Sequence, residues 1–228
     1  MLGIKSLDTN CSLPRGHDHT HKRINNVQVI NSIFSPRTPC TPHMSVNNSW
    51  HFDNLGRKEI ALGEMIKRIN NLITNFPPAC QPEADATMIL NNIWLGNCIV
   101  AHDYHFVRLK QIKYIINATN DIQNKFQSVT SYINFSLRDD DACEFNFMNE
   151  INYCADIINK AVSENSAILI HCKRGHHRSA SIVAYYLMKY HNMALIDAIY
   201  LIKSLRPTTF RRMTCMMKTL ICYENSMK

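Results

Sequence analysis

The chain of 228 residues lacks any apolar run close to the roughly 18 residues that a membrane-spanning helix needs. It also lacks a continuous apolar segment after its first charged residue, where a secretory signal would be found. These absences argue against a membrane span and predict an intracellular protein. Hydrophobic residues still make up 46% of the sequence, enough for the core of one domain of about 100–200 residues plus an extension.

The cysteines lack the pattern of a metal site or of a disulfide framework. There are nine of them, an odd number, and they are scattered along the chain with no C-x-x-C pair. Such usage favours a reducing compartment, the cytoplasm or the nucleus. The histidines of HDHTHK, at residues 17–22, alternate in a segment without fixed geometry, so we expect no functional metal site there and no cofactor.

The basic residues lack the dense tracts with interleaved aromatics that favour nucleic-acid binding. The formal charge is nevertheless +7, and the sequence contains eleven histidines besides. A moderately basic chain suits anionic substrates, although most of these charges are expected to form an ordinary solvated surface. We therefore expect no nucleic-acid partner.

Residues 1–56 lack sustained hydrophobic periodicity and are rich in Asn, Ser, His, Thr and Pro. This composition cannot bury enough apolar surface to offset the entropy of ordering, so it predicts a disordered tail. Ser35, Thr38 and Thr41 stand before or near prolines, the context that proline-directed kinases require.

Residues 57–81 are expected to form an amphipathic helix and a linker, because apolar residues recur at spacings of three and four until Pro77 and Pro78. The KRINNLI segment, residues 67–73, faintly resembles the basic-plus-aliphatic docking motifs that kinases recognise. Packing of this helix on the rest of the domain is the favoured interpretation, and kinases are kept as candidate partners.

Residues 82–228 are expected to alternate between strands and helices. AILIH, residues 167–171, is a short apolar run bounded by polar residues, which fits a central strand buried on both faces. Further strands are expected at 88–90, 93–97, 114–119 and 131–137, the first two joined by a turn at Asn91 and Asn92. Helices are expected at 99–109, 145–162 and 211–223, with two more after residue 178 that join near Asn192.

The stretch ILIHCKRGHHRSAS, residues 168–181, places a loop between a strand and a helix, with the pattern HCxxGxxRS. In such a loop, successive backbone N–H groups and the positive end of the helix dipole can converge on one anion. The same groups would stabilise the thiolate of Cys172, which is the nucleophilic form of cysteine. Arg178 would hold two oxygens of a bound phosphoryl group with its planar guanidinium. We call residues 172–178 the signature loop.

The neighbours of Cys172 are given supporting roles. Ser179 can donate a hydrogen bond to the sulfur, which would help the cysteine leave when water attacks a phosphocysteine. His171 is expected to orient the loop backbone rather than to transfer a proton. The candidate substrate-binding residues are His171, Lys173, Arg174, Gly175, His176, His177 and Arg178.

This stretch resembles the active-site signature of the cysteine-dependent protein phosphatases, specifically of their dual-specificity branch. WLGNCIVAHD, residues 94–103, resembles the family's early YLGN…A…D block, and AYYLMKYHNM…DAIYLIKSLRP is similar to a late block of the small atypical members. The resemblance covers about residues 88–224. It implies an α/β fold with a central, mostly parallel sheet of about five strands flanked by helices, in a catalytic domain at 82–228. After Arg206 and Pro207 the family's xxPNxGF is absent and TTFRRMT stands in its place, so the resemblance assigns no role to that final turn.

The resemblance also implies a carboxylic acid on a separate loop, which protonates the leaving oxygen. Asp139, Asp140 and Asp141 follow a predicted strand at the separation from Cys172 that the family shows. DACEFN, residues 141–146, resembles the stretch that follows the acid, which favours Asp141, with Asp140 second. The expected mechanism has two steps and needs no metal. Cys172 attacks phosphorus while Asp141 protonates the leaving oxygen, and Asp141 then activates the water that hydrolyses the phosphocysteine.

The expected activity is hydrolysis of phosphotyrosine and of phosphoserine or phosphothreonine in proteins. The loop is unusually basic, however, and HCKRGHHRS also resembles the HCxRGKHRT loop of plant and fungal phosphatases that act on inositol pyrophosphates. A phosphoinositide or an inositol pyrophosphate is therefore the alternative substrate. An RNA 5′-phosphatase is less favoured, because that branch usually has Thr after the arginine. An inactive phosphobinding module is also disfavoured, because such proteins typically lack the cysteine or the arginine.

Two further questions stay open at the level of sequence. Cys98 and Cys143 are candidate partners for a disulfide that would protect an oxidised Cys172. The oligomeric state and the physiological substrate are not predicted.

Overall fold

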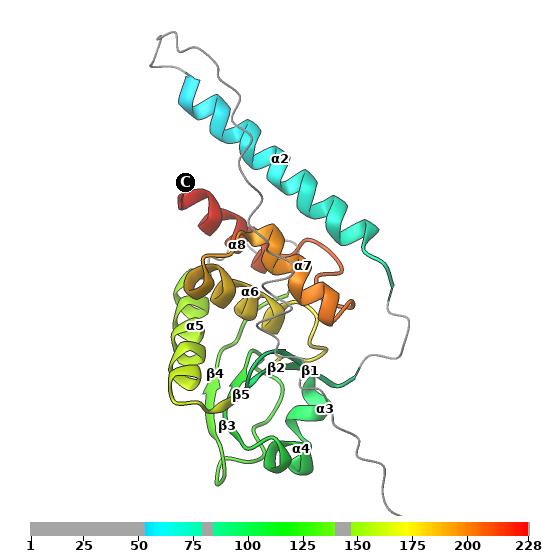
Figure 1. Ribbon diagram of the computed structural model, residues 1–228, viewed down its shortest axis with the longest axis vertical. Helices are drawn as coiled ribbons and strands as arrows, with labels where there is room; N and C mark the ends of the chain where they lie inside the picture. Colours follow the sequence, from blue (N-terminus) through cyan, green and yellow to red (C-terminus); the bar gives the residue numbers. More distant parts are fainter. Residues whose placement is uncertain (1–52, 79–83, 140–146, 228) are drawn as a thin grey trace, which may run out of the picture. The chain divides into compact units, whose positions relative to one another are not determined.

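The computed structural model describes residues 53–78, 84–139 and 147–227, and within these residues a five-stranded sheet has the order β1-β2-β5-β3-β4 (Figure 1). The strands are β1 (Ala86–Leu90), β2 (Ile93–Gly96), β3 (Ile112–Asn117), β4 (Ser131–Asn134) and β5 (Ala167–His171). β1 and β2 pair in antiparallel fashion, and the other three pairings are parallel. The predicted α/β fold with a mostly parallel sheet is therefore confirmed.

Several sequence-based predictions lie outside the described residues. These are residues 1–52 of the predicted tail, with His17–Lys22, Ser35, Thr38 and Thr41, the two candidate acids Asp140 and Asp141, and Cys143. The last residues of that predicted disordered tail, 53–56, are helical instead, because the helix predicted to start at residue 57 begins one turn earlier. All described residues belong to one compact unit, Met44–Lys228.

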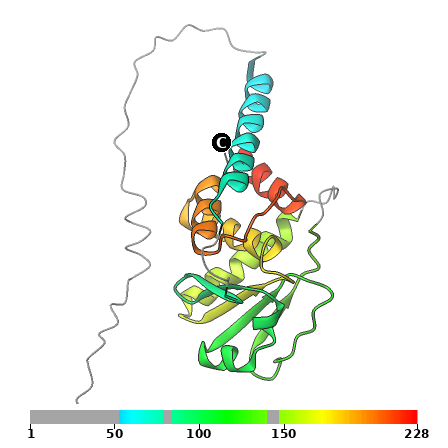
Figure 2. The ribbon, with the colours of Figure 1, turned by 90° about the vertical axis from the view of Figure 1, so that its right-hand side faces the viewer.

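Helices cover both faces of the sheet (Figures 1 and 2). They are α2 (Asp53–Asn75), α3 (Cys98–Ala101), α4 (Tyr104–Leu109), α5 (Met148–Ser163), α6 (Arg178–His191), α7 (Leu195–Leu205) and α8 (Cys215–Ser226). The smaller core, on one face, joins α3 and α4 to β3 and β5. The larger core, on the other face, is formed mainly by α5, α6, α7 and α8. None of the helices in the described part of the chain is long and apolar enough to cross a bilayer.

Strand β5 lies in the middle of the sheet, and all five of its residues are buried. Ile168 and Ile170 pack into the larger core, whereas Ala167 and Leu169 pack into the smaller one. This alternation explains why AILIH is apolar at every position before its final histidine, since both of its faces are covered. The prediction of a central strand here is confirmed, and the strand delivers its carboxyl end to the signature loop.

The single helix expected at 99–109 is two short helices instead. The Asn97 side chain accepts hydrogen bonds from the backbone N–H groups of Ile99 and Val100, and so caps α3. The Asp103 side chain accepts one from the N–H of Phe106 and starts α4. The prediction of one continuous helix was wrong because hydrophobic spacing continued across Asp103, while its carboxylate made a new helix start more favourable.

Helix α2 packs on the larger core through Ile69 and Ile73, which are buried. Its neighbours Lys67 and Arg68 are exposed. The aliphatic positions of the KRINNLI segment are therefore used in packing, which agrees with the favoured interpretation of this helix.

The last helix begins at Cys215 rather than near residue 211. Residues 206–214 instead form a loop in which Phe210 has a positive φ of 48°. A residue in the left-handed conformation cannot continue a right-handed helix, so α8 begins only after Thr214, its N-cap residue. This loop, which we call the second loop, reaches the functional site.

Candidate active site

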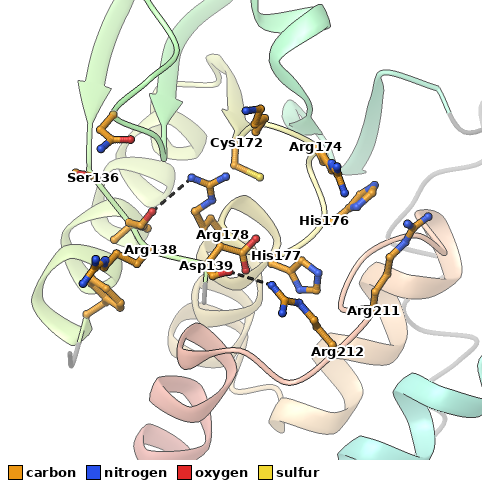
Figure 3. Close-up of a pocket in the computed structure, with 14 residues that line it drawn as sticks. Ser136, Arg138, Asp139, Cys172, Arg174, His176, His177, Arg178, Arg211 and Arg212 are labelled. Atoms are coloured by element: carbon orange, nitrogen blue, oxygen red, sulfur yellow. Dashed lines mark hydrogen bonds between the residues drawn. The ribbon is translucent and has the colours of Figure 1, made fainter. Parts of the chain in front are cut away.

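The signature loop connects the end of β5 at His171 to the start of α6 at Arg178. Its backbone therefore lies beyond the carboxyl end of the central parallel strand, where open α/β sheets form their ligand sites. Figure 3 shows Cys172 and Arg178 on the same pocket wall, with the guanidinium close beneath the cysteine. The arrangement of strand, loop and helix follows the local order of the sequence.

Cys172 is held by hydrogen-bond donors on two sides. The N–H of Gly175 donates to Cys172 Sγ at 3.2 Å, and Ser179 Oγ donates to it at 3.3 Å. The cysteine is 2% exposed, so little water competes with these donors. Hydrogen bonds to a sulfur favour its negatively charged form, which is what a nucleophilic thiolate requires.

Gly175 is required at the turn of the loop. Its φ is +70°, and a Cβ at this position would lie 2.6 Å from the carbonyl oxygen of Gly96. The missing side chain therefore lets the loop approach the end of β2 and brings the Gly175 N–H onto the sulfur.

Arg178 has donors available for a bound anion. Its Nη1 is 3.5 Å from the carbonyl oxygen of Leu137, the long hydrogen bond drawn in Figure 3. Its Nε is buried and has no hydrogen-bond partner among the described residues. A buried guanidinium donor without a partner is costly, and an anionic ligand in the pocket would relieve that cost.

His171 is buried at the end of β5, and burial lowers the pKa of its imidazole to about 4. The ring is therefore neutral near pH 7 and is not the imidazolium that could act as an acid toward a leaving group. Its backbone carbonyl accepts a hydrogen bond from Ala118 N at 2.9 Å, which fixes the strand end beside β3. Its role in orienting the loop stays a prediction.

A pocket of about 840 Å³ opens in front of the loop. Its described lining residues are Asn120, Ser136, Leu137, Arg138, Asp139, Phe147, Cys172, Lys173, Arg174, His176, His177, Arg178, Arg211 and Arg212. Of the candidate site residues, Cys172, Lys173, Arg174, His176, His177 and Arg178 meet there, whereas His171, Gly175 and Ser179 support the loop from behind. Sequence reasoning missed Arg138, Arg211 and Arg212.

The candidate acids enter from the segment after β4. Asp139 lines the pocket, and its backbone carbonyl accepts a hydrogen bond from Arg212 Nη2 at 3.1 Å. Asp140 and Asp141 follow it directly but lie outside the described residues. The structure therefore brings the start of the Asp-Asp-Asp run to the pocket, and the choice of Asp141 stays a prediction.

Among the basic residues of the signature loop, Lys173 also makes contacts outside the pocket. Lys173 Nζ lies 3.6 Å from Asp121 Oδ2, an exposed ion pair to the loop after β3. The backbone carbonyl of Lys173 accepts a hydrogen bond from Cys98 N, which places the start of α3 against the loop.

No three His, Cys, Asp or Glu side chains in the described ranges are grouped to hold a metal ion.

The second loop is attached to the signature loop at two points. Arg206, which is 1% exposed, donates from Nε to the carbonyl of Gly175 at 3.3 Å. The N–H of Phe210 donates to the carbonyl of His176 at 2.9 Å. These bonds fix where the following residue, Arg211, meets the pocket. The only sequence signal for this contact was the departure of TTFRRMT from the expected pattern.

Comparison with known proteins places the chain in a family. The family model described as "Dual specificity phosphatase, catalytic domain" matches residues 93–226. Mouse dual specificity protein phosphatase 14 is 31% identical over 139 residues, which are 61% of this chain and 69% of the relative. Human dual specificity protein phosphatase 21 is 34% identical over 122 residues, which are 53% of this chain and 63% of the relative.

The fold agrees with the same group. The crystal structure of human DUSP28 superposes with a TM-score of 0.57 at 17% identity, covering 65% of this chain and 98% of that one. At this identity the likeness bears on the fold alone.

Proposed function

Because the chain belongs to the dual-specificity phosphatase family, and is a cysteine-dependent protein phosphatase, we propose that Cys172 is its nucleophile and Arg178 its phosphate-binding residue. The substrates on this proposal are phosphotyrosine and phosphoserine or phosphothreonine in proteins. The observation that carries it is the pair of donors on Cys172 Sγ in the wall of a cationic pocket.

In the first step, the Cys172 thiolate attacks phosphorus in line with the leaving oxygen. A sulfur–phosphorus bond forms as the phosphorus–oxygen bond breaks, and Asp141 gives its proton to the departing oxygen. Arg178 and the N–H groups of residues 173–178 hold the remaining phosphoryl oxygens, whose charge they stabilise through the transition state.

In the second step, water attacks the phosphocysteine. The Asp141 carboxylate takes a proton from the water, the sulfur–phosphorus bond breaks, and inorganic phosphate is released. The hydrogen bond from Ser179 Oγ supports the developing thiolate, so the cysteine becomes a better leaving group. His171, neutral near pH 7, takes no part in either proton transfer.

The direct test uses Cys172→Ser. This variant should lose hydrolysis of p-nitrophenyl phosphate and still bind inorganic phosphate, because Arg178 and the loop N–H groups remain. Cys222→Ser is the matched control, since Cys222 is an exposed free cysteine on α8. Substantial turnover by Cys172→Ser would refute the nucleophile, and absence of turnover by the wild-type enzyme would favour a phosphobinding module.

A second candidate function has one specific observation in its favour. The described pocket lining holds six Lys and Arg side chains, namely Arg138, Lys173, Arg174, Arg178, Arg211 and Arg212. Such a field suits a densely charged small molecule as well as a phosphoprotein. A panel of phosphopeptides, a phosphoinositide and an inositol pyrophosphate separates the two, and the phosphoprotein reading requires higher kcat/KM for the peptides.

Kinase partners and an intracellular location belong to the same proposal. Lys67 and Arg68 are the exposed basic residues of α2 through which a kinase would dock. Loss of co-purification with a kinase in a Lys67→Ala, Arg68→Ala double variant supports docking at this helix. The location is checked by imaging the tagged full-length chain in cells.

A further inference from the structure

The segment that leads to the candidate acids belongs to no helix or strand. Strand β4 ends at Asn134, and residues 135–139 follow it toward the pocket without regular secondary structure. The backbone carbonyls of such a segment have no ladder partners, so other groups must satisfy them where the chain is covered. The donors that reach these carbonyls therefore decide where the segment lies.

The carbonyls of residues 137, 138 and 139 all accept hydrogen bonds from side chains of other elements. In chain order the donors are Arg178 Nη1 at 3.5 Å, Cys215 Sγ at 3.6 Å and Arg212 Nη2 at 3.1 Å. They come from the end of the signature loop, the first residue of α8 and the second loop, respectively. The backbone that precedes Asp140 is thus fixed at three consecutive positions.

The bond from Arg212 has the best geometry of the three. Its 3.1 Å lies within the normal range for an N–H donor, whereas 3.5 Å is long and a thiol is a weak donor. Figure 3 shows the Arg212 guanidinium turned toward Asp139, while that of Arg211 points to the other side of the pocket, toward His176. No hydrogen bond joins Arg211 to residues 137–139.

The backbone just before Arg212 is itself attached to the signature loop. The N–H of Phe210 donates to the carbonyl of His176 at 2.9 Å. Phe210 is 1% exposed and has a φ of +48°, which a bulky residue keeps only when its surroundings fix it. Arg212 therefore connects the segment that carries the candidate acids to the loop that carries the nucleophile.

We propose that Arg212 is a positioning residue for the general acid, on which it acts through the backbone of Asp139. The inference rests on the proposed function, because an acid is needed only if the chain cleaves a phosphate ester. Proton transfer requires the acid within hydrogen-bond reach of the leaving oxygen, and a misplacement of about 1 Å can slow a reaction about a hundredfold. Asp140 and Asp141 follow Asp139 directly, so a shift of its carbonyl displaces them as well.

This role also accounts for the segment that departs from the dual-specificity pattern. Arg212 belongs to TTFRRMT, and Cys215 follows that segment directly. Two of the three donors to the carbonyls of residues 137–139 therefore come from positions to which the shared motifs assign no role.

The test compares two aryl phosphates whose leaving groups differ in their need for a proton. Phenolate is a strong base and depends on the acid, whereas 4-nitrophenolate is a much weaker base and depends on it less. Arg212→Met should lower kcat/KM about tenfold for phenyl phosphate and less than about threefold for p-nitrophenyl phosphate. Arg212→Lys should restore part of the loss, because its ammonium can still donate to the carbonyl.

The matched control is Arg211→Met, which removes the same charge from the neighbouring position in the pocket wall. It should change kcat/KM for both esters by one common factor, because no bond to residues 137–139 is lost. An equal loss for both esters in Arg212→Met would overturn the positioning role and leave the proposed function intact.

A double variant shows whether Arg212 acts through the acid. Asp141→Asn should reproduce the unequal losses in larger size, because the acid of the proposed mechanism is then missing. Adding Arg212→Met to it should change the ratio of the two kcat/KM values no further. A further tenfold change in that ratio would overturn action through the acid. Activity retained by Cys172→Ser would instead overturn the proposed function.

Discussion

The buried guanidinium of Arg206 donates a hydrogen bond from Nε to the carbonyl oxygen of Gly175, at 3.3 Å. Its Nη1 also donates to the carbonyl of Ala84 at 2.7 Å and to Thr87 Oγ1 at 3.1 Å. One side chain thus connects the signature loop, the second loop and the edge strand β1. Residues far from the reacting phosphorus therefore determine the shape of the loop that binds it.

Replacing Arg206 with leucine should destabilise the protein and distort the loop. The change leaves the buried carbonyl of Gly175 and the part-buried carbonyl of Ala84 without this donor, so we expect a loss of about 3 kcal/mol in the free energy of unfolding. Urea denaturation measures it, with Arg108→Leu as the exposed control. A stability equal to that of the control would contradict the supporting role of Arg206.

The hydroxyl of Ser179 should matter chiefly for the second chemical step. Ser179→Ala removes the 3.3 Å donor to Cys172 Sγ, and we expect phosphocysteine hydrolysis to slow about tenfold. Stopped-flow assays with an aryl phosphate should then show a burst of product followed by a slow steady state. Ser181→Ala is the control, because the hydroxyl of this buried serine on α6 has no hydrogen-bond partner among the described residues. Equal slowing of phosphocysteine hydrolysis by Ser179→Ala and Ser181→Ala would contradict the proposed role of the Ser179 hydroxyl.

The two glycines Gly175 and Gly63 should respond oppositely to alanine. Gly175→Ala introduces a Cβ 2.6 Å from the Gly96 carbonyl at a positive φ, so it should cost more than about 1 kcal/mol of stability and most of the activity. Gly63 lies within α2, and a Cβ there meets no atom within 4 Å. Gly63→Ala should therefore stabilise the chain by about 0.5–1 kcal/mol. Thermal unfolding measures the stability of both variants, and aryl phosphate hydrolysis measures their activity. A Gly175→Ala variant with wild-type stability and activity would refute the close approach of Gly175 to the Gly96 carbonyl.

Lowering the pH should destabilise the fold, because the folded chain resists protonation of the buried His171. Burial lowers the pKa of His171 to about 4, below its unfolded value of about 6.5. As the pH falls through this interval, the unfolded chain binds a proton that the folded chain resists, so stability decreases by up to about 3 kcal/mol. Urea denaturation at several pH values should show a shallower decrease for His171→Gln than for the wild type. The exposed His105→Gln should keep the wild-type slope, and a common slope for all three would contradict the assignment.

The sequence predicted those features that depend on neighbouring residues. AILIH, the signature loop and α6 are consecutive, so one apolar run and one HCxxGxxRS pattern were sufficient to place Cys172 near Arg178. The break between α3 and α4 was missed because the spacing of hydrophobic residues carries no information about a capping carboxylate such as that of Asp103. The contribution of Arg211 was missed because it depends on a tertiary contact, the bond from Phe210 to His176, that no local pattern encodes.

The central claim is that Cys172 carries the phosphoryl group between the two steps. Rapid acid quenching of the Ser179→Ala variant during turnover of a phosphotyrosine peptide, followed by peptide mass spectrometry, tests it directly. The account predicts one added phosphoryl group on the peptide that contains Cys172. Turnover with the phosphoryl group on another residue would contradict it.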